Sequence, residues 1–170
     1  MFRSLTMVVA SLAVIGFSSQ AHAGEPRLLG DYGAWEAYVF FENGQKVCYM
    51  ASQPTKAEGD YTKRGEPFAL ITHRPADDTR DVFSYITGYN YKTGSEAKAI
   101  IDGKEFVLYT QDETAWGPDP ETDTKLADAI KNGSKLVIKG ISSRGTHTTD
   151  TYSLSGSSKA YKKISQECDD

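Results

Sequence analysis

The chain has 170 residues, with 19 Lys and Arg residues against 23 Asp and Glu residues and a formal net charge of −4. This length fits a single domain that buries a hydrophobic core. The mild acidity argues against a nucleic-acid-binding protein, which needs a basic face, and the lack of a polybasic cluster argues against binding to anionic lipid.

Residues 1–23 have the composition of a signal peptide. Arg3 precedes an apolar stretch over residues 7–17, and an Ala-His-Ala triplet ending at Ala23 places small residues where signal peptidase accepts them. The apolar stretch is about half of the roughly 20 residues that a membrane-spanning helix needs, so a membrane anchor is the less favoured alternative. We therefore expect cleavage after Ala23 and a periplasmic or secreted protein, in which residues 24–170 form one domain without a transmembrane segment.

Most of this domain is predicted to be β-strand. Before the final hairpin, the strands are apolar or alternating runs bounded by turn residues, at 35–41, 46–52, 68–72, 82–86, 97–101 and 106–109. Asn43-Gly44 and Asp102-Gly103 are the turn signals of two hairpins. Residues 53–66, rich in Pro, Lys, Gly and Glu, are predicted to be a surface loop.

Two helices are predicted among the strands. Residues 120–132 carry apolar residues at helical spacing, acidic residues in the first turn, and Lys131 and Gly133 at the end. Residues 158–167 place apolar residues four apart on one face, and a final strand is the alternative there. The predicted fold class is mainly β: a single antiparallel β-sandwich-like domain with one or two short helices.

The final hairpin, residues 135–156, is the most informative segment. Apolar and small polar residues alternate along both limbs, and Arg144-Gly145 marks the turn because glycine adopts positive φ without steric cost. Ordinary hairpins rarely contain so many hydroxyl side chains. The composition therefore favours a hairpin that presents a surface to a partner.

The same hairpin resembles a known family. The pattern VKGxSxRGxxTxDTYSL of the invasion-associated locus B family is matched by Ile138-Lys139-Gly140, Ser142, Arg144-Gly145, Thr148 and Asp150-Thr151-Tyr152-Ser153-Leu154, with isoleucine in place of the first valine. Other similar pieces follow the same order along the chain: Trp35, Val47-Cys48-Tyr49, Ser52-Gln53-Pro54, Thr72-His73-Arg74-Pro75, Gly88-Tyr89, Ala115-Trp116, Asp119-Pro120 and Cys168. The resemblance implies a secreted or periplasmic β-rich protein of the alphaproteobacterial envelope, linked in some pathogens to entry into host cells. It implies no established enzymatic reaction.

Cys48 and Cys168 are the two cysteines of the chain. An even pair in an exported protein is most simply a disulfide. Closing the long loop between them would stabilise the fold by about 4–5 kcal/mol in the chain-entropy model. The pair lacks the further ligands of a metal site, and we expect neither a metal nor a cofactor.

The hypothesised binding surface is the corner of the final hairpin. Arg144 would be its charged anchor, with Thr149, Asp150 and Tyr152 around it. A guanidinium can fork onto a carboxylate, so Asp150 on the opposite limb is the expected partner of Arg144. A self-contained structural corner is the alternative interpretation.

The favoured function is that of an exported, non-enzymatic envelope protein of the invasion-associated locus B type. It would bind a protein or glycan partner in the envelope or on a host surface. A small periplasmic hydrolase using Ser142 or Ser143 with His147 is an alternative, although no GxSxG nucleophile elbow is present. A periplasmic stress or chaperone-like factor is another, favoured only by export and acidity. The sequence leaves the partner and the oligomeric state open.

Overall fold

The computed structural model describes residues 24–169, so the predicted signal peptide lies outside the described residues. Within this range eleven strands form one sheet, in the order β1-β2-β3-β5-β6-β9-β8-β7-β10-β11-β4, and every neighbouring pair is antiparallel. The strands are β1 (Arg27–Asp31), β2 (Glu36–Glu42), β3 (Gln45–Ser52), β4 (Lys56–Gly59), β5 (Phe68–Arg74), β6 (Thr79–Ile86), β7 (Glu96–Ile101), β8 (Lys104–Gln111), β9 (Thr114–Trp116), β10 (Lys135–Ile141) and β11 (His147–Ser153). A 3-10 turn, η1 (Pro75–Asp77), and two helices, α1 (Pro120–Asn132) and α2 (Ser157–Asp169), complete the chain. The predicted mainly β class with two short helices is confirmed.

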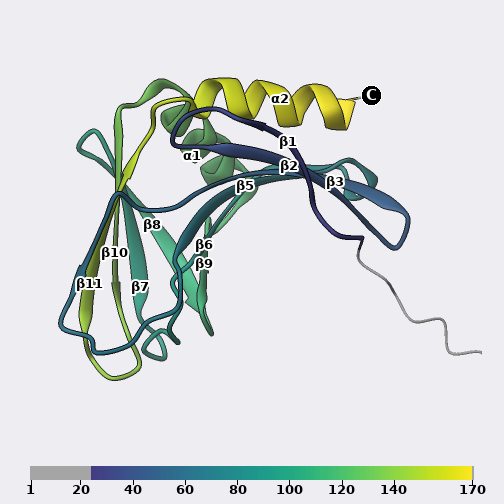
Figure 1. Cartoon of the computed structure of the whole chain (residues 1–170). Coiled ribbons are helices and arrows are strands. Elements are labelled where there is room, and N and C mark those ends of the chain that lie inside the picture. Colours follow the sequence, from purple (N-terminus) through teal and green to yellow (C-terminus); the bar gives the residue numbers. More distant parts are fainter. Residues whose placement is uncertain (1–23, 170) are drawn as a thin grey trace, which may run out of the picture.

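Both helices cover the same part of the sheet. In Figure 1, α2 runs along β1, β2 and β3, and α1 lies beside it, packed against β6. The strands β7, β8, β10 and β11 run downward from this region in the figure, so the sheet twists strongly between its two ends. The helices therefore leave the lower part of these four strands uncovered.

One hydrophobic core joins the sheet to the helices. Its largest fully buried side chains come from strands, helices and the segment before β2, and include Trp35, Met50, Ile71, Phe83, Leu108, Leu126, Ile130, Leu136 and Ile164. The indole of Trp35 also donates a hydrogen bond of 3.0 Å to the carbonyl of Ser153. This bond fixes the start of β2 to the end of β11.

The two predicted hairpin turns are confirmed. Asn43 and Gly44 between β2 and β3 have φ values of 52° and 78°, and Asp102 and Gly103 between β7 and β8 have φ values of 46° and 92°. Two successive residues with positive φ give a turn whose twist matches that of the flanking strands. Asn-Gly and Asp-Gly favour this conformation, so the register of both hairpins follows from the sequence.

Both predicted helices are confirmed. Asp119 caps α1 by accepting a hydrogen bond of 2.7 Å from the amide of Thr122, and Pro120 occupies the first turn. In α2 the buried residues Ala160, Ile164 and Cys168 lie four apart and face the sheet. The alternative of a final strand is wrong.

The predicted disulfide is also present. Cys48 in β3 is bonded to Cys168 in the last turn of α2, with the two Cα atoms 6.0 Å apart. The bond ties α2 to β3, the third strand from one end of the sheet. Among residues 24–169, neither helix is long and apolar enough to cross a membrane.

Three strands were not predicted: β1, β4 and β9. The predicted surface loop 53–66 contains β4, which pairs with β11 between Lys56 and Thr151 at one end and Gly59 and Thr148 at the other. All four residues of β4 are exposed, so the segment has no apolar alternation that would mark it as a strand. Its pairing with β11 positions residues 60–65 beside the final hairpin.

Candidate binding pocket

The direction of each side chain in the final hairpin follows from the pairing of β10 with β11. The register places Ile138 opposite Asp150 and Gly140 opposite Thr148. Because side chains alternate along a strand, Thr148, Asp150 and Tyr152 all point to the inner face, and all three are buried. These residues of the final hairpin therefore hold other segments in place from inside the fold.

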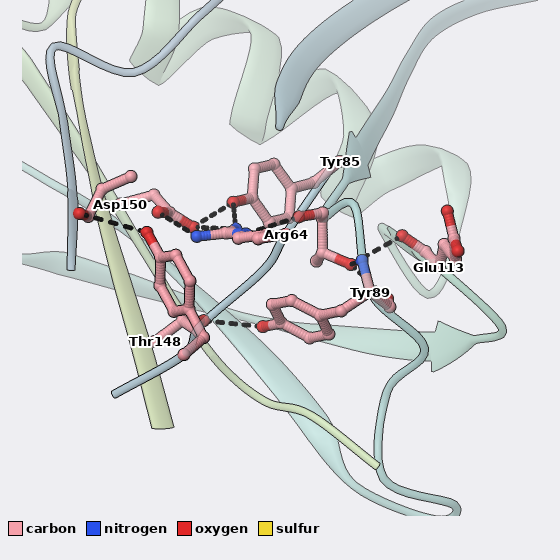
Figure 2. A network of polar contacts seen from close by, with 9 residues as sticks. Arg64, Tyr85, Tyr89, Glu113, Thr148 and Asp150 are labelled. Carbon is pink, nitrogen blue, oxygen red and sulfur yellow. Dashed lines mark hydrogen bonds and ion pairs between the residues drawn. The ribbon is translucent and has the colours of Figure 1, made fainter. Parts of the chain in front are cut away.

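Asp150 binds a buried arginine from another part of the chain. Arg64 donates through its two terminal nitrogens to both carboxylate oxygens of Asp150, at 2.7 and 2.6 Å. The side chains are 4% and 1% exposed, so this is a buried, two-pronged ion pair. Tyr85 donates to the same carboxylate, and Figure 2 shows the guanidinium of Arg64 beside both Asp150 and Tyr85.

All three nitrogens of the Arg64 guanidinium donate hydrogen bonds. Its Nε donates to the carbonyl of Thr87 at 2.7 Å, and one terminal nitrogen also lies 3.1 Å from the hydroxyl of Tyr85. Burial alone would lower the pKa of Arg64, but the hydrogen bonds to Asp150 and the charge of that carboxylate raise it above its ordinary value. For Tyr85, burial raises the pKa, so its hydroxyl stays protonated and acts as a neutral donor.

Two tyrosine rings surround the arginine. The guanidinium carbon of Arg64 lies 5.0 Å from the centre of the Tyr89 ring and 5.5 Å from that of Tyr61. The hydroxyl of Tyr89 is 2.6 Å from the hydroxyl of Thr148 (Figure 2). Tyr89 thus links the arginine to the inner face of β11.

Glycines allow these segments to approach one another. The amide of Gly65 donates to the carbonyl of Gly88 at 2.9 Å, and a Cβ at Gly88 would lie 2.4 Å from the carbonyl oxygen of Gly65. Gly88 also has a φ of 74°, which favours glycine. A Cβ at Gly140 would lie 2.8 Å from the Tyr89 hydroxyl and from the Tyr91 ring. Only glycine fits at Gly88 and Gly140 without displacing these neighbours.

These contacts enclose a pocket of about 470 Å³. Three segments line it: residues 60–65, residues 88–90 with Glu113, and the end of the final hairpin between Ser142 and Thr148. The volume lies in the range of small-molecule sites. We call this cavity the Arg144 pocket, because Arg144 is an exposed cation on its wall.

The structure separates the four residues of the hypothesised corner. Arg144 lines the Arg144 pocket, whereas Thr149 is half-buried and lies on a different shallow hollow. Asp150 and Tyr152 are fully buried, so they can support a surface but cannot touch a partner directly. The expected ion pair between Arg144 and Asp150 is wrong, because Arg64 occupies the carboxylate of Asp150.

The residues of the alternative hydrolase are also divided. Ser142 and Ser143 line the Arg144 pocket, whereas His147 lies on an adjacent hollow with Asp60 and Gly145. The hydroxyl oxygen of Ser142 accepts a hydrogen bond of 3.1 Å from the amide of Thr146, which belongs to the turn itself. Within residues 24–169, no hydrogen bond joins the hydroxyl of Ser142 or Ser143 to His147, so neither serine is paired with an activating base.

Sequence reasoning missed the residues that complete this site. Arg64 and Lys63 lie in the segment predicted to be a plain surface loop, and Arg64 meets Asp150 across 86 positions of sequence. Tyr89 was noted only as part of the Gly88-Tyr89 piece of the family resemblance, and Tyr61 was not singled out. Strand alternation could have indicated that Asp150 is buried. A buried carboxylate needs a buried cation as its partner, but the sequence does not identify that cation as Arg64.

A model of the invasion associated locus B (IalB) protein family matches residues 35–165 of the chain. The matched range includes β3, which carries Cys48, and the whole final hairpin. Arg64 and Asp150 also lie within the matched range. No curated protein and no solved structure was found to match. Since the match covers most of the chain, the protein belongs to the invasion associated locus B (IalB) family.

Proposed function

We propose that this protein is an exported, non-enzymatic envelope protein that binds an envelope component or a host-surface ligand in the Arg144 pocket. Membership of the invasion associated locus B family supports an invasion-associated envelope protein. The disulfide between Cys48 and Cys168 fits an oxidising compartment such as the periplasm or the cell exterior. Its pocket supplies the surface on which a ligand would bind.

The main support for the proposal is that the walls of the Arg144 pocket are fixed in position by contacts within the protein. Its three walls belong to segments far apart in sequence, and the buried pair of Arg64 and Asp150 joins two of them. A buried ion pair contributes little net stability over an apolar pair, and we infer that this one serves to fix a single geometry of the pocket. A wall fixed before binding lowers the cost of ordering on association. This is the behaviour expected of a recognition site.

A binding role is favoured over a catalytic one by the placement of the polar side chains. Ser142 uses its hydroxyl oxygen within the turn, and His147 lies outside the Arg144 pocket. Arg144, in contrast, is exposed on the pocket wall and can reach a ligand. A charged side chain in that position can anchor a partner without any chemistry.

The experiment is crosslinking in cells, followed by mass spectrometry of the captured partner. Wild type would be compared with Arg144→Glu and with Lys162→Glu, a matched charge reversal at an exposed position of α2. We expect a partner captured by wild type and Lys162→Glu but lost with Arg144→Glu. Identical capture by all three proteins would show that the Arg144 pocket is not the binding site. Equal melting temperatures for the three proteins would confirm that the loss does not come from unfolding.

A further inference from the structure

We propose that the Arg144 pocket binds an acidic sugar, a ring with several hydroxyl groups and one carboxylate. This inference rests on the proposed binding function and names the chemical class of the ligand.

Hydroxyl groups dominate the lining. They come from Tyr61, Thr62, Tyr89, Ser142, Ser143, Thr146 and Thr148. Within the described residues, the lining includes no Leu, Ile, Val, Met or Phe side chain. Binding sites for apolar ligands or hydrophobic peptide anchors are lined mainly by such side chains, so the pocket is unsuited to them.

Some of these hydroxyls are already engaged within the protein. Thr148 and Tyr89 bond to each other at 2.6 Å, and Tyr61 donates to the carbonyl of Ala57 at 3.3 Å. Ser142 accepts a bond from the turn, but its own proton is not used in that bond. Ser142 and the exposed Ser143 can thus donate to a ligand that carries hydroxyl oxygens.

The charges in the lining indicate one acidic group on the ligand. Of the three cations there, Arg64 is neutralised by Asp150, which leaves Lys63 and Arg144 as exposed cations. An arginine fork matches the two oxygens of a carboxylate. Arg144 is therefore the residue that we assign to the carboxylate of the sugar.

Two exposed carboxylates belong to the same lining, Asp60 and Glu113. Each can accept hydrogen bonds from sugar hydroxyls. The same two charges would repel a polyanion such as a nucleotide polyphosphate or a densely charged chain. A ligand with one acidic group and many hydroxyl groups can therefore bind both the cations and the carboxylates of the lining.

The test uses two sugars that differ at one carbon. Glucuronic acid carries a carboxylate where glucose carries a hydroxymethyl group, so the pair isolates the acidic group. Each sugar would be titrated into the disulfide-bonded protein by ligand-observed NMR, at concentrations up to about 10 mM to cover millimolar affinity. Wild type, Arg144→Glu, Arg144→Lys and Lys162→Glu would be compared.

We expect wild type and Lys162→Glu to bind glucuronic acid in preference to glucose. Arg144→Glu should weaken binding of glucuronic acid by about tenfold or more, because a charge-assisted hydrogen bond is replaced by repulsion. Arg144→Lys should retain part of the affinity, because it keeps the charge but loses the fork. Equal binding of both sugars, or binding of neither, would overturn the assignment to an acidic sugar.

The result can be separated from that of the crosslinking experiment. If neither sugar binds but a captured protein still depends on Arg144, the proposed function stands and the sugar assignment falls. If glucuronic acid binds equally to wild type and Arg144→Glu, the acidic sugar is not held by this pocket. Folding of each variant would be checked by its melting temperature.

Discussion

The carboxylate of Asp150 and the guanidinium of Arg64, 86 positions apart in sequence, form two hydrogen bonds of 2.7 and 2.6 Å inside the fold. This pair connects β11 to the segment that follows β4, and both contribute residues to the lining of the Arg144 pocket. The positions of these two parts of the lining therefore depend on a buried ion pair.

Replacing Asp150 with Asn should strongly destabilise the protein. The change leaves the positive charge of Arg64 buried without its counter-charge, and breaking a buried pair in this way costs about 3–5 kcal/mol. Urea unfolding measures the loss. Asp128→Asn is the matched control, because Asp128 pairs with Lys131 on the exposed side of α1 and should change stability by less than about 1 kcal/mol. Equal effects of the two substitutions would show that the buried pair does not hold the pocket segments.

Removing the disulfide should destabilise the fold as a whole. Cys48 and Cys168 close a loop with a sequence separation of 120, for which the chain-entropy model gives about 4–5 kcal/mol. The double substitution of both cysteines by Ala should lower the free energy of unfolding by an amount of that order. Hydrogen exchange should show α2 opening before the sheet. Unchanged protection in α2 would contradict the view that the bond holds this helix.

Stability should fall as the pH falls below the ordinary pKa of histidine, about 6.5, because of His73. This side chain is buried, its Nδ1 accepts from the amide of Asp81 at 3.1 Å, and its Nε2 lies 3.2 Å from the hydroxyl of Ser165 in α2. Burial lowers its pKa, so the unfolded chain takes up a proton more readily than the folded protein. His73→Asn keeps an acceptor toward Asp81 but does not titrate. Unfolding at about pH 8 and about pH 5 should show a smaller loss of stability for this variant than for wild type; equal losses would rule out His73 as the cause.

Asp123 should have the opposite effect on the pH dependence of stability. Its side chain is buried between α1 and β6, where Oδ1 accepts from the amide of Phe83 at 3.2 Å. Burial raises its pKa to about 6, so the folded protein holds a proton that the unfolded chain releases. Wild type should therefore lose stability relative to Asp123→Asn as the pH rises from about 4 through about 6. A constant difference between the two proteins across that range would contradict this prediction.

The sequence predicted those parts of the fold that local interactions decide. Asn43-Gly44 and Asp102-Gly103 adopt the positive φ values that such pairs favour, and Asp119 with Pro120 begins α1 at the predicted residue. The strand β4 was missed because its stability comes from pairing with β11 and not from burial of its own side chains.

The candidate site was predicted only in part, for a related reason. Arg144 was identified correctly as an exposed cation at the turn, whereas the partner of Asp150 was assigned to the nearer arginine. The buried partner, Arg64, comes from a polar segment that is brought to β11 by long-range pairing. No periodicity within that segment reveals the contact.

The most direct test of the account is site-specific photo-crosslinking in cells. A photoreactive amino acid would replace Ser143, which is exposed on the wall of the Arg144 pocket, or Lys162, which is exposed on α2. We predict an adduct from position 143 that disappears in an Arg144→Glu background, and no such adduct from position 162. Equal labelling from both positions, or an adduct from position 143 that persists with Arg144→Glu, would contradict the assignment of the binding site to this pocket.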